Sequence, residues 1–113
     1  MKRLLILLLA IGFGTAMYAQ KGSNLQKRGD IQFRNFNFEK ATRLYTKALD
    51  KNPELYASME KLAESYRLMN DWPNAEKWYG ELVKIPGAKP EFFYYYAQAL
   101  RSNSKYDMAK TYF

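Results

Sequence analysis

The chain has 113 residues, with 18 lysine and arginine residues against 11 aspartate and glutamate residues, and it contains neither histidine nor cysteine. This composition excludes imidazole or thiolate zinc sites, Ser-His-Asp and Cys-His nucleophilic machinery, disulfides and thiol redox chemistry. One domain of this length has little room for a deep catalytic cleft, so a binding role is favoured over an enzymatic one.

The first nineteen residues have the layout of a secretory signal peptide. Lys2 and Arg3 precede an unbroken apolar run over residues 4–11, and small residues follow it. This pattern predicts export, with cleavage after either Ala16 or Ala19. The apolar and small stretch is shorter than the roughly 20 residues that a membrane-spanning helix needs, so a retained anchor is the weaker interpretation.

Residues 22–113 repeat with a period of 34 residues. Six columns of the repeat keep small or bulky apolar side chains in register: Gly29, Ala63 and Ala97; Ala41, Ala75 and Ala109; Leu25, Met59 and Phe93; Phe38, Trp72 and Tyr106; Leu44, Trp78 and Tyr112; Tyr45, Tyr79 and Phe113. A period of this length is typical of a stacked helix-turn-helix array, in which each unit buries its apolar face against its neighbours. In this scheme the small residues let paired helices approach closely, and the aromatic residues three before and four after the second small residue pack around it.

Polar and proline residues mark the ends of the second helices. Asn37 and Asp71 are predicted N-caps, whereas Lys105 occupies that position in the third unit. Pro53 and Pro86 are predicted to end the second helices of the first two units. We therefore expect an all-α fold with helices at about 22–35, 38–51, 54–69, 72–84, 89–102 and from 105 onward.

This pattern resembles the tetratricopeptide repeat family over residues 22–113. The resemblance implies a helix-turn-helix solenoid of about two and a half repeats, at 22–55, 56–89 and an incomplete 90–113. Arg28 and Gln32 occupy apolar or aromatic positions of the later units, which suits a terminal repeat with one side in water. Because the last unit is apolar and unfinished, we expect a fragment of a longer protein; the alternative is that this end meets a partner.

In such an architecture the first helices line a concave groove, and one stripe of each faces into it. The predicted groove residues are Gln26, Asp30, Phe33, Glu60, Glu64, Arg67, Tyr94, Gln98 and Arg101. Among the consecutive aromatics 92–96, the columns assign Phe93 and Tyr96 to packing and leave Tyr94 on the groove. Mixed charge suits an extended peptide or protein segment, and a solvated inner face without a ligand is the alternative.

Two glutamates in this groove bear on the kind of function expected. Tetratricopeptide domains that clamp a terminal carboxylate use lysine and asparagine on this surface, where Glu60 and Glu64 are found instead, so a carboxylate clamp is not expected. The two glutamates lie four residues apart on one helix, and not across a closed site as in a retaining glycosidase. We predict neither catalysis nor a metal or cofactor site.

A basic stripe of Lys40, Arg43, Lys47 and Lys51 follows the predicted outer face of the first unit's second helix. Such a stripe suits anionic lipid, cell-wall polymer or nucleic acid, and predicted export argues against nucleic acid. An ordinary solvated face, with Glu39 paired to Arg43, is the alternative.

Several segments also resemble the amino-terminal repeats of exported OmpA-family proteins of Gram-negative bacteria, including PorE-like components of the type IX secretion and gliding apparatus. They are Ala19-Gln20, residues 27–30, residues 60–72 and residues 94–101. The resemblance implies a periplasmic, outer-membrane-associated scaffold that binds protein or peptide segments of the envelope, with peptidoglycan bound only by a missing carboxyl-terminal domain. The alternative is a binder of envelope glycan or an anionic surface that uses the basic stripe and Tyr94.

Overall fold

The computed structural model describes residues 21–113, so the predicted signal peptide lies outside the described residues. Within residues 21–113 the regular secondary structure is entirely α-helical. The helices are α2 (Ser23–Arg34), α3 (Phe38–Lys51), α4 (Tyr56–Leu68), α5 (Trp72–Leu82), α6 (Pro90–Ser102) and α7 (Tyr106–Tyr112). Each begins and ends within about two residues of its predicted range, which confirms the all-α prediction.

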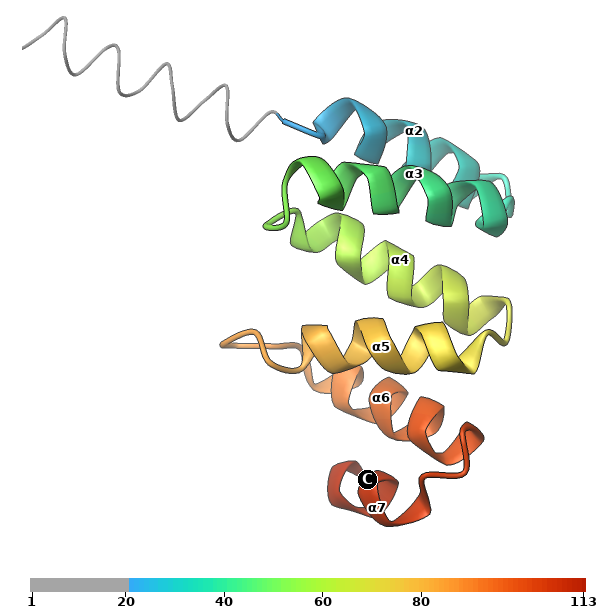
Figure 1. Ribbon diagram of the computed structural model, residues 1–113, viewed down its shortest axis with the longest axis vertical. Helices are drawn as coiled ribbons and strands as arrows, with labels where there is room; N and C mark the ends of the chain where they lie inside the picture. The colour runs from blue at the N-terminus through green and yellow to red at the C-terminus, as the bar shows by residue number, and fades with distance from the viewer. Residues whose placement is uncertain (1–20) are drawn as a thin grey trace, which may run out of the picture.

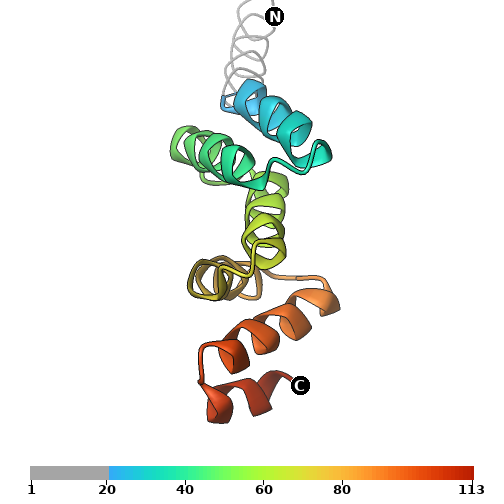
Figure 2. The ribbon, with the colours of Figure 1, turned by 90° about the vertical axis from the view of Figure 1, so that its right-hand side faces the viewer.

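The helices stack in chain order to form an elongated, repeat-like array (Figure 1). Each helix packs against the next one along the chain, and α2 also reaches α4. Viewed from the side, α3 and α5 lie on the left of the stack, and α2, α4 and α6 lie to their right (Figure 2). The array therefore has two distinct sides, one built from the first helices of the pairs and one from the second helices.

The turn inside each helix pair has the same backbone conformation in all three units. Phe36, Asn70 and Ser104 lie 34 residues apart and have φ values of 58°, 58° and 64°. In each turn the next residue donates its backbone N–H to a carbonyl five residues earlier, as Asn37 does to Gln32 over 2.9 Å. This left-handed closure is a Schellman-type helix end. The 34-residue period of the sequence is thus also a period of the backbone.

Small side chains lie at the contact between the two helices of each pair. Gly29 and its column partners Ala63 and Ala97 are buried, as are the second-helix alanines Ala41, Ala75 and Ala109. A Cβ atom on Gly29 would lie 2.7 Å from the Tyr45 ring, closer than any ordinary carbon contact. The absence of a side chain at Gly29 therefore sets how closely α2 and α3 approach.

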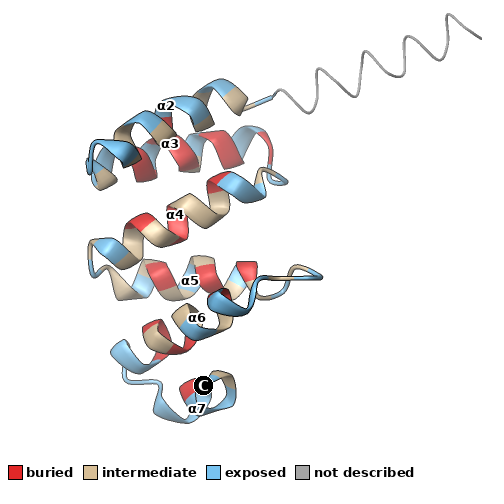
Figure 3. Ribbon diagram, turned by 180° about the vertical axis from the view of Figure 1, so that it is seen from behind, coloured by how far each residue is buried: buried red, intermediate tan, exposed pale blue. Residues whose placement is uncertain are grey.

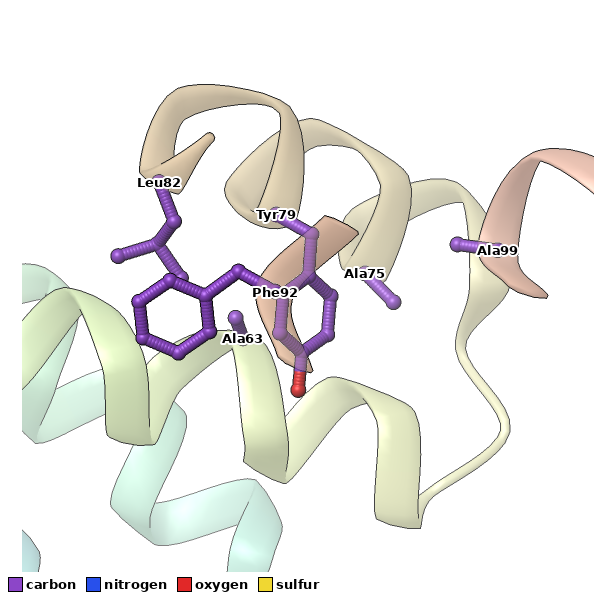
Figure 4. Close-up of a cluster of buried hydrophobic side chains, with 6 residues drawn as sticks. All are labelled: Ala63, Ala75, Tyr79, Leu82, Phe92 and Ala99. Atoms are coloured by element: carbon purple, nitrogen blue, oxygen red, sulfur yellow. The ribbon is translucent and has the colours of Figure 1, made fainter. Parts of the chain in front are cut away.

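The largest buried cluster lies where α4, α5 and α6 meet (Figure 4). The Tyr79 ring lies 6.4 Å from that of Phe92 and 5.5 Å from that of Tyr95, measured between centroids. A second cluster around Tyr45 and Leu62 joins α3 to α4. Each cluster is shared by neighbouring helix pairs, so adjacent units are needed to complete the burial of one unit's apolar face.

The two outermost described helices are the least buried (Figure 3). In α2 only Gly29 is buried, and Arg28 is exposed, as predicted for a terminal unit. In α7 only Ala109 is buried, and Tyr106 and Phe113 are 59% and 58% exposed. The prediction that the two aromatic residues pack around Ala109 is therefore wrong in the third unit, because α7 packs mainly against one helix, α6.

The predicted N-caps differ in what their side chains do. Asp71 accepts a hydrogen bond from the backbone N–H of Asn74 at 3.3 Å and caps α5. Asn37 occupies the N-cap position of α3 but makes no capping bond; its amide donates to the Gln32 side chain at 3.2 Å. The repeat places Tyr66 at the position of Gln32, so the competing amide acceptor exists only in the first unit.

We expect Gly29→Ala to lower the free energy of unfolding by about 1 to 3 kcal/mol, because the added methyl group meets the Tyr45 ring. Helix propensity alone would give the opposite sign, a gain of up to about 1 kcal/mol. Urea denaturation followed by circular dichroism measures the difference.

Gly80→Ala is the matched control, since Gly80 also lies inside a helix but an added Cβ atom there would lie 3.6 Å from the Tyr96 ring, an ordinary contact. This variant should be as stable as the wild type or more stable. Equal stabilisation by both substitutions would refute the close contact between Gly29 and Tyr45.

Candidate functional site

The nine predicted groove residues all lie on the first helices α2, α4 and α6, and we call the side they share the groove face. Two pockets lie along it, and Glu60 lines both of them. The first pocket also contains Asp30 and Phe33, and the second contains Glu64 and Arg67. The other four predicted residues line neither of these two pockets: Gln26, Tyr94, Gln98 and Arg101.

The first pocket lies between α2 and α4 and has a volume of about 420 Å³. Its apolar surface comes from Phe33 and Ala57, and its rim carries both charge signs from Asp30, Arg34, Glu60 and Lys61. The Lys61 ammonium lies 4.3 Å from the centroid of the Phe33 ring. This volume is within the range of ligand pockets, and the alternating charges suit a polar segment with an apolar side chain.

The second pocket has a volume of about 200 Å³ and is lined by α4, α5 and α6. Glu60, Glu64 and Glu91 supply three carboxylates around the single cation Arg67. The aromatic walls come from Tyr79, Phe92 and Tyr95. The first pocket is therefore mixed in charge, whereas the second is mainly acidic and aromatic.

Arg67 is fixed on three sides in the second pocket. Its Nε donates to the Tyr79 hydroxyl at 3.1 Å, and its guanidinium carbon lies 4.1 Å from the centroid of the Tyr95 ring. Its Nη2 lies 4.0 Å from Glu64, and only 21% of the side chain is exposed. A partly desolvated guanidinium on an aromatic face makes a stronger cation–π contact than an exposed one. Arg67 thus joins α4 to both α5 and α6.

The contact between Arg67 and Tyr95 has a counterpart one unit earlier in which the two residue types are exchanged. Lys61 covers Phe33, and Arg67 covers Tyr95. Phe33 and Arg67 are 34 residues apart, as are Lys61 and Tyr95. The same pair of positions therefore links α2 to α4 and α4 to α6, with the aromatic ring first in one pair and the cation first in the other.

Glu60 is held from outside its own helix. Its two carboxylate oxygens accept hydrogen bonds from the Lys89 ammonium at 3.0 and 3.2 Å. The hydrogen bond to Glu60 raises the pKa of Lys89, which is exposed. Lys89 precedes α6, so this ion pair connects the boundary of the two pockets to the start of the third unit.

Two buried tyrosines connect the core to the groove face. The Tyr45 hydroxyl donates to Asp30 Oδ1 at 2.6 Å, and burial together with this bond raises the pKa of Tyr45. Burial raises the pKa of Tyr79 to about 12, although the hydrogen bond from Arg67 opposes the shift. Tyr45 and Tyr79 occupy one repeat column, so equivalent core residues orient the Asp30 carboxylate in the first unit and the Arg67 guanidinium in the second.

The remaining predicted groove residues have other surroundings. Gln26 accepts a hydrogen bond from the buried Ser58 hydroxyl at 2.7 Å, which ties α2 to α4. The Tyr94 ring is 54% exposed and lies 5.8 Å from the Phe113 ring, and the Arg101 guanidinium lies 5.4 Å from the same ring. Gln98 is partly buried. Tyr94 and Arg101 of α6 thus surround the Phe113 ring outside the second pocket.

Several residues that line the two pockets were not among the predicted groove residues: Arg34, Ala57, Lys61, Tyr79, Glu91, Phe92 and Tyr95. A stripe at i, i+4 and i+7 spacing describes a narrower face than the helices present. The 34-residue offset between Lys61 and Tyr95 is a signal that was present in the sequence. Lys61 directly follows Glu60, and Tyr95 directly follows Tyr94, so a predicted face one residue wider would have included both Lys61 and Tyr95.

All four residues of the basic stripe are exposed on α3, as expected: Lys40, Arg43, Lys47 and Lys51. Arg43 pairs with Glu39 at 3.4 Å, and both side chains are largely exposed. An exposed pair of this kind contributes little to stability. The stripe lies on α3, and none of its four residues lines either pocket.

Within residues 21–113, no group of three or more aspartate, glutamate, histidine or cysteine side chains is arranged to hold a metal ion. Each helix over these residues is too short or too polar to cross a membrane. Comparison with known proteins adds no relative: no family model matches the sequence, and no curated protein matches it.

We expect Arg67→Met to lower the free energy of unfolding by about 1 to 2 kcal/mol, because it removes both the cation–π contact and the hydrogen bond to Tyr79. Lys61→Met breaks the equivalent exposed contact and should cost about 0.5 kcal/mol or less. Urea denaturation of the two variants tests the ranking, and an equal cost would contradict it.

The stability of the fold should decrease at alkaline pH. Because the pKa of folded Tyr79 is raised from 10.0 to about 12, its stabilising effect is complete below pH 10 and is lost as the pH rises towards 12. From about pH 9 to about pH 11 the wild type should lose about 1 kcal/mol more than Tyr79→Phe. Parallel pH profiles for the two proteins would contradict this assignment.

Proposed function

We propose that residues 22–113 form a tetratricopeptide-type repeat domain that binds a protein or peptide segment on its groove face. The fold supports this through stacked helix pairs whose turns recur every 34 residues. The main observation is that two pockets of different chemistry share Glu60 and so form one continuous surface. An extended segment with alternating side chains can use such neighbouring pockets.

The proposed role is scaffolding and not catalysis. Glu60 is bound by Lys89, and Glu64 contacts both Lys61 and Arg67. A general acid or base needs to reach the substrate proton directly, whereas these carboxylates already contact lysine and arginine side chains. The ion pairs instead make the groove face a rigid and electrically varied surface for recognition.

The proposed location is the periplasm, with association to the outer membrane as part of an OmpA-family-like protein. Two sequence features support it: the signal-peptide layout of residues 1–19, and the resemblance of Ala19-Gln20 and residues 27–30, 60–72 and 94–101 to exported proteins of that type. In this proposal the domain contributes protein contacts to a type IX secretion or gliding assembly. A further domain outside this chain would bind peptidoglycan.

The proposed binding to the groove face is tested by using the purified protein to capture and cross-link partners from an envelope extract. The purified protein carrying Glu60→Lys should lose the partner that the wild type captures, because the substitution reverses the charge shared by both pockets and breaks the bond to Lys89. The captured protein is identified by mass spectrometry and then titrated in purified form. We expect its affinity to fall by about tenfold or more.

Glu81→Lys is the matched control, because it makes the same charge change at an exposed site on α5, where Glu81 pairs only with Lys84. It should leave capture unchanged. Equal loss with both variants would indicate a response to net charge, and equal retention would remove the groove face from the proposal.

A further inference from the structure

Three side chains at the α6–α7 end of the described stack form one exposed cluster, which we call the end face. Phe113, directly after α7, is 58% exposed, and the Tyr94 ring of α6 lies 5.8 Å from the Phe113 ring, edge to face. The Arg101 guanidinium carbon lies 5.4 Å from the centroid of the same Phe113 ring. None of the three residues lines a pocket of the groove face. The end face is therefore an aromatic surface with one cation, separate from the two pockets of the proposed function.

Phe113 occupies a repeat column whose other two members are covered by the first helix of the next unit. Tyr45 is 0% exposed and packs in one cluster with Leu62 of α4. Tyr79 is 2% exposed and lies beside Phe92 of α6, with 6.4 Å between the ring centroids (Figure 4). Within residues 21–113 no first helix follows α7, and the third member of the column is exposed. The Phe113 ring thus lies where a first helix covers the two earlier units.

Arg101 belongs to a second column whose earlier members also contact the next first helix. The Phe33 ring of α2 lies 4.3 Å from the Lys61 ammonium of α4. The Arg67 guanidinium of α4 lies 4.1 Å from the Tyr95 ring of α6. Because the third unit supplies the cation, as the second unit does, the group that would complete the contact of Arg101 is an aromatic ring.

Tyr94 belongs to a third column with the same property. Gln26 of α2 accepts a hydrogen bond at 2.7 Å from the Ser58 hydroxyl of α4. Glu60 of α4 accepts a hydrogen bond at 3.0 Å from Lys89, the residue before α6. In the first two units, all three columns therefore contact the first helix of the next unit or the residue that precedes it. The repeat itself indicates that a helix of this kind fits the end face.

We infer that the end face binds an amphipathic helix of a partner protein, which packs there as α6 packs on α4 and α5. This helix presents one apolar ring to Phe113 and, three residues later, a second aromatic ring to Arg101. The spacing is that of Phe92 and Tyr95, which contact the equivalent residues one unit earlier. Recognition of the apolar face of a helix is a recurring mode of protein binding.

A second copy of this chain would be a poor occupant. The first helix at the other end of the described stack is α2. At the positions where α6 carries Phe92 and Tyr95, α2 carries two exposed polar residues, Asn24 and Lys27. Lys27 would meet Arg101, and like charges across an interface oppose association. The chemistry of the end face therefore favours a different protein, whose helix carries two rings at these positions.

Fluorescence anisotropy with the purified protein tests the inference. The probe is a fluorescein-labelled synthetic helical peptide in which phenylalanine and, three residues later, tyrosine share one face with alanines. Lysine and glutamate in equal numbers occupy the other faces, so the peptide has no net charge. We expect saturable binding to the wild type. A matched peptide with alanine in place of both rings should bind at least about tenfold more weakly.

Two substitutions assign the peptide to the end face. Phe113→Ser should weaken binding by about tenfold or more, and Arg101→Gln by about fivefold, because each removes the contact with one ring. Both residues are exposed, so circular dichroism should show unchanged helix content. Phe36→Ser and Arg28→Gln are matched controls that remove an exposed ring and an exposed cation from the first unit. They should leave the affinity unchanged.

Four results would overturn the inference. They are no binding by the wild type, equal binding of the peptide without rings, equal loss of affinity in the control variants, and unchanged affinity in both end-face variants. Sedimentation equilibrium of the protein without peptide tests a second copy as the occupant. We expect Phe113→Ser to leave the molecular mass in solution unchanged. A dimer that dissociates in this variant would assign the end face to self-association and overturn the inference as well.

Discussion

In the first two units the close approach of the paired helices depends on one contact, in which a tyrosine ring of the second helix occupies the space that a small residue leaves on the first. Gly29 shows its strictest form, since even a methyl group there would collide with Tyr45. Ala63 and Tyr79, one unit later, are both buried in the same cluster. The distance between helices sets the positions of their outward-facing side chains, so this contact determines the geometry of the surfaces that these two units present.

The same tyrosines that pack the core also organise the groove face. The ring of Tyr45 is buried while its hydroxyl holds Asp30, and the ring of Tyr79 is buried while its hydroxyl accepts from Arg67. A buried tyrosine needs a partner for its hydroxyl, and here that partner is a charged groove residue. Core packing and the geometry of the proposed groove face therefore share one column of the repeat, and a change at Tyr45 or Tyr79 would affect both.

Much of the fold could be predicted from the sequence, because the 34-residue period, the small residues and the helix-stopping prolines all report on local packing. The period could not reveal that Asn37 bonds to Gln32 and leaves α3 without a side-chain cap. It also could not show that Tyr106 and Phe113 remain exposed, since burial in a stack requires a neighbour on each side. The candidate site was predicted in part: the correct helices were identified, but Lys61 and Tyr95 were missed because the width of a helix face depends on how its neighbours diverge.

At the repeated left-handed turns the backbone conformation is constant, whereas the side chain exposed there differs from unit to unit. Phe36, Asn70 and Ser104 share one conformation, which is easily adopted by asparagine and is costly for a bulky side chain. Their side chains nevertheless differ completely, and the Phe36 ring is 80% exposed. Along this edge the molecule tolerates chemical variety without any alteration of its stacking. The side chains at these turns can therefore differ from unit to unit while the backbone conformation and the helix stacking stay the same.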